Sequence, residues 1–369
     1  MIRTPFATIF FLFVFCSSLL YGQSAYYSSI DFSQTGDDLK AQLSELITET
    51  HTAFIPYTAQ STDTWDVLST SDLEFSTSDN VLLMYGYDNN DGMFVSDRLR
   101  GVFEKCNFMG CTATPGLWNR EHVFAKSHAN PSLVTSSPGP GTDVHNLRAV
   151  DSEKNGQRWY RMFIDDLGVD SRTIEDPNED PDEDTPDPFY PGDEWKGDVA
   201  RIIMYMYLRY PSQCEAINSA KGSANYSPNG DMPDVFLEWN EEDPVSALEL
   251  TRNDVISSYQ GNRNPFIDNP YLATLIWNGP AANDSWGTLS LAVFDEVLVS
   301  ISPTITNRHI EISGLGESDF NVTIYSHLGH ELASFRRSKT IDVSSFSSGL
   351  YIVHVVHPKG TSQVKFMVR

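Results

Sequence analysis

Two stretches decide the fold and the chemistry that we predict for this chain: Asn119-Arg120-Glu121-His122-Val123-Phe124, and then Asp143-Val144-His145-Asn146-Leu147. They place the carboxylate of Glu121 next to the imidazole of His122, with the amide of Asn146 one loop later. Mg²⁺ prefers oxygen ligands and keeps several waters, so one carboxylate and one amide oxygen are a sufficient protein contribution. Glu121 and Asn146 are therefore the candidate metal ligands, and His122, whose ordinary pKa is near neutral, is the candidate general base. This residue set predicts metal-assisted hydrolysis of a phosphodiester.

The spacing of these residues also makes a structural prediction. Neighbouring side chains on a strand point to opposite sides, so the strand must end or bend at Glu121 and His122 for both to face one site. Residues 129–142 are rich in Pro, Ser and Gly and form the loop that follows. We expect a short hairpin and then a helix that carries Asn146 back beside Glu121.

Basic residues gather in the same segment of an otherwise acidic chain. Six cations lie between positions 120 and 161: Arg120, Lys126, Arg148, Lys154, Arg158 and Arg161. They could contact phosphates and stabilise the charge that develops during transfer. They could equally pair with Asp143, Asp151 and Glu153 on a helix surface. A zinc site in which His128 joins His122 and His145 has no supporting spacing.

Composition and charge limit the function. The chain has 369 residues, 40% of them hydrophobic, and a formal net charge of -25. That charge argues against a protein that coats nucleic acid or anionic lipid over its whole surface, and it leaves room for a local basic site. It suits a secreted protein.

The N-terminus predicts export. Arg3 precedes a short apolar run over 9–14, and small or polar residues follow up to Gly22, so we expect a signal peptide over 1–22. No later segment is apolar enough to predict a membrane span. In an oxidising compartment Cys106 and Cys111 can form a disulfide, leaving Cys214 unpaired; three buried free thiols are the alternative.

The rest of the chain predicts an α+β fold in two domains. A mostly helical domain around a small sheet covers 23–285, a linker covers 286–299, and a small β-sandwich covers 300–369. Helical periodicity marks 38–51, 198–210 and 236–259, the last split near Asp243-Pro244, and turn formers mark a loop over 262–270. Alternating patterns predict strands over 309–312, 320–325, 351–356 and 364–368. The acidic, proline-broken run over 165–188 is a solvated loop or, alternatively, a Ca²⁺ site.

Residues 118–127, 143–151 and 155–158 together resemble the endonuclease I family, which are secreted or periplasmic nonspecific nucleases with a ββα-metal (His-Me finger) site. Residues 196–201 and 260–268 resemble later parts of that family, so the similarity spans roughly 43–277.

The resemblance implies that His122 activates the attacking water, that Glu121 and Asn146 bind Mg²⁺ (with Ca²⁺ or Mn²⁺ as alternatives), and that the products carry 5′-phosphates. It also implies a phosphate-stabilising arginine, for which Arg158 and Arg120 are the candidates. A site that holds the backbone and ignores the bases has weak sequence preference.

The C-terminal part resembles the sorting domain of the type IX secretion system, carried by residues 322–329, 346–353 and 365–369. Ser302-Pro303-Thr304 replaces the usual Asn-Pro near the first strand. The resemblance implies that the secretion machinery is a partner and that the protein is secreted or held at the cell surface. A carbohydrate- or protein-binding sandwich is the alternative for this domain.

We therefore expect a secreted, metal-dependent, largely sequence-nonspecific endonuclease acting on DNA, RNA or both. The alternative is a secreted binding or adhesion protein whose nuclease-like site is inactive.

Overall fold

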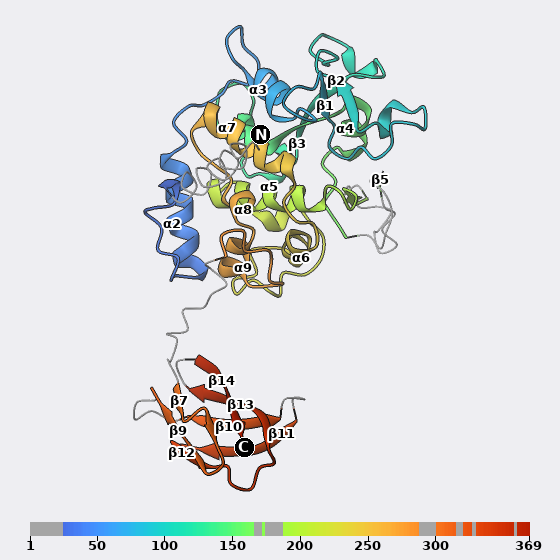
Figure 1. Ribbon diagram of the computed structural model, residues 1–369. Coiled ribbons are helices and arrows are strands. Elements are labelled where there is room, and N and C mark those ends of the chain that lie inside the picture. The colour runs from blue at the N-terminus through green and yellow to red at the C-terminus, as the bar shows by residue number, and fades with distance from the viewer. Residues whose placement is uncertain are drawn as a thin grey trace, which may run out of the picture. The chain divides into compact units, whose positions relative to one another are not determined.

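The structure is a computed structural model, and it describes residues 25–165, 172–173, 187–287, 300–314, 320–326, 330–357 and 360–369. The expected signal peptide, most of the acidic run and most of the expected linker lie outside these residues. The chain divides into two compact units between Trp286 and Gly287 (Figure 1).

The first unit is mostly helical, as the α+β prediction requires. Its helices are α2 (Gly36–Glu49), α3 (Thr64–Ser71), α4 (Ser152–Arg158), α5 (Lys196–Arg209), α6 (Asp234–Glu242), α7 (Ala247–Gln260), α8 (Pro265–Asp268) and α9 (Tyr271–Trp277). Its strands form antiparallel pairs: β1 (Asn80–Leu82) with β2 (Leu99–Gly101), β3 (Trp118–His122) with β4 (Leu147–Asp151), and β5 (Arg172–Thr173) with β6 (Phe189–Tyr190).

Helix α5 runs through the middle of this unit (Figure 1) and is buried from Gly197 to Leu208. Its buried charged residues, Asp198 and Arg201, are paired, as burial requires. Asp198 bonds to Arg148 of β4, and Arg201 bonds to Glu249 of α7 at 2.6 Å. These pairs fix α5 to β4 and α7, so they hold the second strand of the β3–β4 pair in place.

The predicted break near Asp243-Pro244 is confirmed, because α6 ends at Glu242 and α7 begins at Ala247. Ser246 caps α7 by accepting a hydrogen bond from the Glu249 backbone N–H. The loop predicted over 262–270 is only partly correct. Asn264 caps a single helical turn, α8, and Pro265 begins it, a position that proline favours.

A core of large apolar side chains supports the β3–β4 pair. Trp118 of β3 and Leu147 of β4 pack in one cluster with Trp65 of α3 and Ile256 of α7. Trp118 and Leu147 are fully buried. The strands that carry the candidate residues are therefore held in place by packing against α3 and α7.

The second unit is the expected β-sandwich. One sheet has the order β11-β10-β13-β14-β8, and the other has β12-β9-β7. The strands are β7 (Ser300–Ser302), β8 (Ile305–Thr306), β9 (His309–Ser313), β10 (Asn321–Ser326), β11 (Glu331–Arg336), β12 (Thr340–Asp342), β13 (Gly349–His357) and β14 (Gly360–Val368). All four predicted strands are present as β9, β10, β13 and β14. Ile310, Val322, Val353 and Phe366 pack between the sheets.

Two further expectations concern cysteines and membranes. Cys106 and Cys111 form a disulfide, and Cys214 is a buried free thiol. Among the helices that the structure describes, none combines the length and the apolar character needed to cross a bilayer.

Candidate active site

Two antiparallel strands and a helix build the frame of the site. In the β3–β4 pair, Glu121 lies opposite Arg148 and His122 lies opposite Leu147. Asp151 ends β4 and caps α4, with its carboxylate accepting the Glu153 N–H at 2.8 Å. Because α4 starts at the next residue, its first turns lie against β3.

This ββα frame differs from the expected one in where the helix begins. Residues Val144–Asn146 form one 3₁₀ turn, and Leu147 already belongs to β4. The helix starts at Ser152, so the expectation of a helix that carries Asn146 is wrong. The reason is that Leu147 and Val150 pair with β3, which requires an extended chain.

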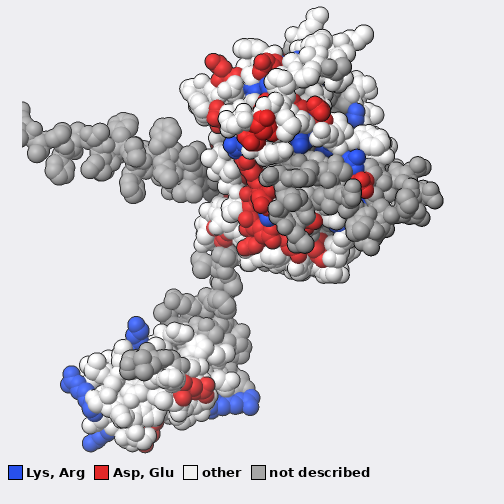
Figure 2. All heavy atoms as spheres, turned by 90° about the vertical axis from the view of Figure 1, so that its right-hand side faces the viewer, with Lys and Arg blue, Asp and Glu red and all other residues white. Residues whose placement is uncertain are grey.

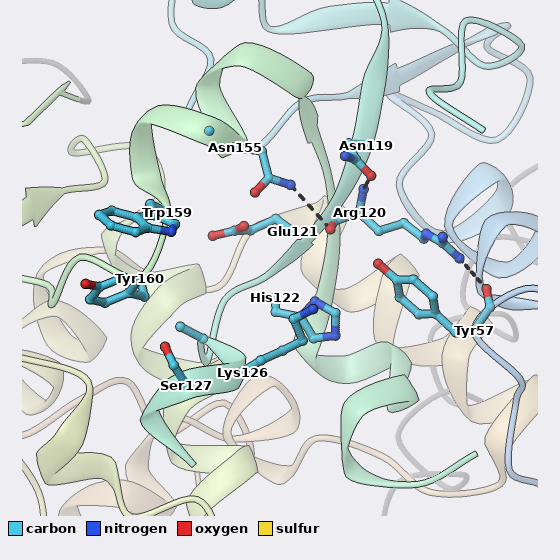
Figure 3. A pocket seen from close by; sticks show the side chains of 12 residues that line it. Tyr57, Asn119, Arg120, Glu121, His122, Lys126, Ser127, Asn155, Trp159 and Tyr160 are labelled. Atoms are coloured by element: carbon cyan, nitrogen blue, oxygen red, sulfur yellow. Dashed lines mark hydrogen bonds between the residues drawn. The ribbon is translucent and has the colours of Figure 1, made fainter. Parts of the chain in front are cut away.

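Strand β3 ends at His122, as the site requires. Glu121 and His122 line one cavity of about 480 Å³, together with Asn155 of α4. Tyr57 stands on one side of this cavity, and Trp159 and Tyr160 stand on the other (Figure 3). A cavity of this size can hold a nucleotide-sized group.

His122 is held in the tautomer that a base needs. Its Nε2 lies 2.8 Å from the carbonyl oxygen of Gly141. A carbonyl only accepts, so Nε2 carries the hydrogen and Nδ1 keeps its lone pair. Burial lowers the pKa of His122 to about 4, so the ring is neutral at neutral pH. The Tyr57 ring stacks on the His122 imidazole, with 5.7 Å between the ring centroids.

Gly141 is required for this arrangement. A Cβ at this position would lie 2.1 Å from the carbonyl oxygen of Val134, far inside van der Waals contact. A larger residue would displace the loop and with it the carbonyl that orients His122. The glycine-rich loop thus contributes a precise backbone acceptor.

Glu121 is buried, with only 2% of its surface exposed. The hydroxyl of Tyr85 donates to its Oε1 at 3.2 Å, and Nε of Arg158 lies 3.5 Å from the same oxygen. Burial raises the pKa of Glu121 to about 7, and the positive charge of Arg158 opposes that rise. A second cation beside this carboxylate would favour its ionised form.

The structure corrects the role expected of Asn146. Its Oδ1 accepts the backbone N–H of Phe124 at 2.7 Å, and its Nδ2 donates to the Phe124 carbonyl at 3.1 Å. The side chain is fully buried and does not line the cavity. Both amide atoms bond to Phe124 and close the chain after β3, so the Asn146 side chain does not reach a metal ion in the cavity.

Asn155 occupies the position that was expected of Asn146. Its Nδ2 donates to the Arg120 carbonyl at 3.3 Å, which leaves its Oδ1 directed into the cavity. Figure 3 shows this oxygen and the Glu121 carboxylate on the same side of the cavity. One carboxylate and one amide oxygen thus converge, which fits the donor set that Mg²⁺ prefers.

Sequence reasoning missed Asn155 although a signal was present. Asp151 is a strong helix N-cap, and Asn155 and Arg158 are three residues apart, so they share a face of the helix that Asp151 starts. Asp143 is a cap as well, but it caps only the single 3₁₀ turn over Val144–Asn146 and not a helix.

Neither candidate arginine points its guanidinium at the centre of the cavity. Arg120 bonds to the Tyr57 carbonyl and lies over the Tyr57 and Trp65 rings at 3.5 and 4.1 Å. Arg158 is fully buried and donates to the carbonyls of Val123 and Trp159 at 3.0 and 2.8 Å. Both therefore support neighbouring parts of the site through these contacts, and a phosphate-stabilising arginine stays a prediction.

Two of the other four cations of the segment are buried as well. Arg148 lies between Asp72 and Asp198, and Lys154 is 4% exposed. Of the six cations, Lys126 is the one that is both exposed and part of the cavity wall. Arg148 and Arg158 do form ion pairs, but these pairs are buried and join them to Asp72, Asp198 and Glu121 rather than to the expected Asp143, Asp151 and Glu153.

Two histidines considered for a zinc site serve other contacts. Nε2 of His128 lies 2.7 Å from the Tyr160 carbonyl, and Nε2 of His145 lies 3.2 Å from the Asn262 carbonyl. Within the described residues no group of three or more His, Cys, Asp or Glu side chains is arranged to hold a metal. Any metal at this site would rely on a mixed set that includes an amide oxygen.

The chain carries a formal net charge of -25. On the face that Figure 2 presents, acidic side chains gather in a band on the first unit and basic ones are scattered. Ion pairs of the first unit include Arg98 with Glu194 and Lys196 with Glu242. A polyanion would be drawn to the cavity by local groups rather than by the field of the whole protein.

A neutral imidazole and a convergent pair of oxygen donors on a ββα frame define the class of protein, a hydrolase whose site suits phosphodiesters. Comparison with known proteins makes this class specific. The chain belongs to the endonuclease I family, because the Endonuclease I family model matches residues 35–271. It is therefore a nuclease.

Two curated relatives support this assignment. The chain is 35% identical over 263 residues to an extracellular ribonuclease of Bacillus subtilis (strain 168), covering 68% of this chain and 78% of the relative. It is 35% identical over 230 residues to an extracellular ribonuclease of Bacillus amyloliquefaciens, covering 58% and 66% respectively.

The second unit has its own family. The model described as a secretion system C-terminal sorting domain matches residues 302–369. This confirms the expected sorting domain, so the protein is a secreted nuclease.

Proposed function

We propose that this secreted nuclease is a metal-dependent, largely sequence-nonspecific endonuclease that hydrolyses RNA, DNA or both to products with 5′-phosphates. The observation that carries the proposal is the convergence of Glu121 and the Asn155 amide oxygen beside the unprotonated Nδ1 of His122.

His122 acts as the general base. Its Nδ1 accepts a proton from the attacking water while the water oxygen bonds to phosphorus. The bond from phosphorus to the 3′-oxygen breaks, and the 3′-oxygen takes a proton from a solvent water. One fragment then carries a 5′-phosphate and the other a 3′-hydroxyl. The Gly141 carbonyl keeps the ring oriented and stabilises the imidazolium that forms, because its acceptor faces the Nε2 hydrogen.

Glu121 and Asn155 would hold the metal ion, with Mg²⁺ as the proposed ion and Ca²⁺ or Mn²⁺ as alternatives. When bound, such an ion polarises the phosphate and stabilises the leaving oxygen. Arg158 and Tyr85 position the Glu121 carboxylate, and Lys126 is placed to contact a neighbouring phosphate.

Weak sequence preference follows from the groups that face the cavity. The proposed contacts go to phosphate and to the metal, and these carry no base information. RNA is included as a substrate because the curated relatives are named extracellular ribonucleases.

The route of export is also proposed. A signal peptide over 1–22 would direct the chain out of the cytoplasm. The type IX machinery would then recognise the domain over 300–369, which a linker over 286–299 joins to the nuclease domain. Secretion places an indiscriminate nuclease away from the chromosome of its own cell.

The test is digestion of plasmid DNA and of a structured RNA by the full chain, with Mg²⁺ and with EDTA. We expect EDTA to abolish cleavage. The ends of the RNA fragments give a second test, because attack by water leaves a 5′-phosphate, whereas attack by the 2′-hydroxyl leaves a 2′,3′-cyclic phosphate. Cyclic ends, or full activity in EDTA, would contradict the proposal.

The alternative, a binding or adhesion protein with an inactive site, has less support. An inactive relative would be free to lose the base, its orienting carbonyl or the donor pair, and this chain keeps all of them. Family membership also favours the enzyme.

A further inference from the structure

A tryptophan at the edge of the cavity has an unusual backbone. Trp159 follows the last residue of α4 and has φ 49° and ψ −121°. Positive φ is strained for a bulky side chain and persists where the surroundings impose it, often at functional sites. The side chain is 59% exposed, yet it lines the cavity that holds Glu121 and His122.

The residues that impose this conformation belong to the site itself. The N–H of Trp159 donates to the Asn155 carbonyl at 2.9 Å, and Nη1 of Arg158 donates to the Trp159 carbonyl at 2.8 Å. Arg158 also lies 3.5 Å from the Glu121 carboxylate. The same buried guanidinium therefore positions both the candidate metal ligand and the exposed indole.

A second ring extends the aromatic wall. The Tyr160 and Trp159 ring centroids are 4.1 Å apart, and the Tyr160 carbonyl accepts the Nε2 hydrogen of His128 at 2.7 Å. Figure 3 shows both rings on one wall of the cavity, with the Glu121 carboxylate directed toward that wall. The two rings are inclined at 56° to each other, so Tyr160 packs against the indole of Trp159 next to the point where a phosphate would bind.

An exposed aromatic surface beside a phosphodiester site suits one chemical partner, the face of a nucleobase. Stacking on tryptophan or tyrosine is tolerant of base identity, so it is consistent with weak sequence preference. In a duplex each base face is covered by its neighbours, whereas an unpaired base can turn out and stack on a protein ring. The wall would therefore favour unpaired strands.

We propose that Trp159, supported by Tyr160, is a base-stacking platform that selects single-stranded nucleic acid or unpaired loops at the scissile phosphate. This inference rests on the proposed function, since it places the base next to the phosphate that Glu121, Asn155 and His122 act on. The nucleotide beside the cleaved bond then lies with its phosphate at the donor pair and its base on the indole.

The first experiment measures binding without cleavage. In the full chain carrying His122→Ala, fluorescence anisotropy with labelled single-stranded and duplex oligonucleotides is compared before and after Trp159→Ala. We expect the Kd for the single strand to rise between about fivefold and about 150-fold and the Kd for the duplex to stay unchanged. Trp159→Phe keeps a ring and should recover most of the affinity.

A matched control exists at Phe75, which is 56% exposed and lines none of the cavities described around the site. Phe75→Ala should change neither Kd. Because the Trp159 indole is largely exposed, its truncation leaves the core intact, and thermal unfolding of each variant verifies this.

The second experiment uses the chain with its native His122. Trp159→Ala should raise KM on single-stranded substrate by the same factor and leave kcat/KM on duplex unchanged. Equal losses on both substrates, or no loss on either, would overturn the stacking platform. Failure of the proposed function looks different, because the wild-type chain would then show no metal-dependent cleavage while the binding comparison could still be made.

Discussion

Replacing Asn155 by Ala tests the corrected assignment of the metal ligands. Loss of an outer-shell partner alone typically costs ~10–100-fold in metal affinity, so loss of a ligand should cost at least that much. The fold should tolerate the change, because the Asn155 side chain is half-buried and makes one long hydrogen bond of 3.3 Å. That bond contributes about 1 kcal/mol or less, equivalent to a Tm change of less than ~4 °C.

Asn146→Ala is the matched control, because it removes the same amide from the neighbouring motif. Asn146 is fully buried and bonds to both the N–H and the carbonyl of Phe124, at 2.7 and 3.1 Å. Two buried backbone groups would lose their partners at ~1–3 kcal/mol each, so the free energy of unfolding should fall by ~2–6 kcal/mol. At ~2–4 °C per kcal/mol, Tm should fall by ~4–24 °C.

The two variants should therefore give opposite results in two assays. Mn²⁺ titration followed by electron paramagnetic resonance should show weakened binding for Asn155→Ala and near wild-type binding for the folded fraction of Asn146→Ala. Thermal unfolding in EDTA should show a lowered Tm for Asn146→Ala and a Tm close to that of the wild type for Asn155→Ala. Wild-type Mn²⁺ affinity in Asn155→Ala, with lost affinity and unchanged Tm in Asn146→Ala, would refute the reasoning.

Four further measurements test other parts of the site. At saturating metal, kcat should hold as pH falls and decline only toward about 4, because the depressed pKa keeps His122 neutral; a decline centred near 6.5 in a pH–rate profile would contradict this. At subsaturating metal the rate should already fall below about pH 7, because the raised pKa of Glu121 makes protons compete with the ion, and isothermal titration should detect the proton released. Arg158→Ala should lower the free energy of unfolding, measured by urea titration, by ~3–5 kcal/mol, because it leaves Glu121 buried without its cation; an unchanged stability would contradict the supporting role of Arg158. Lys126→Ala should weaken binding of all sequences alike and reduce the slope of log K against log salt by about 1, whereas an unchanged slope would remove Lys126 from the phosphate path.

Local pattern was sufficient to predict much of the fold. The apolar periodicity of α5 and the proline at the α6–α7 junction are signals within one segment, and each corresponds to an observed element. The strands β9, β10, β13 and β14 follow from alternation in the same way. The turn α8 was missed because Asn264-Pro265 reads equally well as a loop and as a helix start.

The site was harder to predict because its details depend on residues far apart in the chain. Arg148 pairs with Asp72 and Asp198, which no local spacing could indicate. Asn146 and Asn155 are both amides soon after a capping Asp. Only the pairing of β3 with β4 shows that Asn146 bonds to the chain just after β3, whereas Asn155 faces the cavity.

The central claim is that Glu121, His122 and Asn155 form a hydrolytic site in which His122 is the base. The most direct measurement is single-turnover cleavage of one labelled RNA oligonucleotide by wild type and by His122→Ala, with metal saturation confirmed for both. A positioned general base contributes ~10²–10⁴-fold, so the rate constant should fall by that factor while Mn²⁺ affinity stays at the wild-type value. A rate constant equal to that of the wild type, with 5′-phosphate products, would contradict the account.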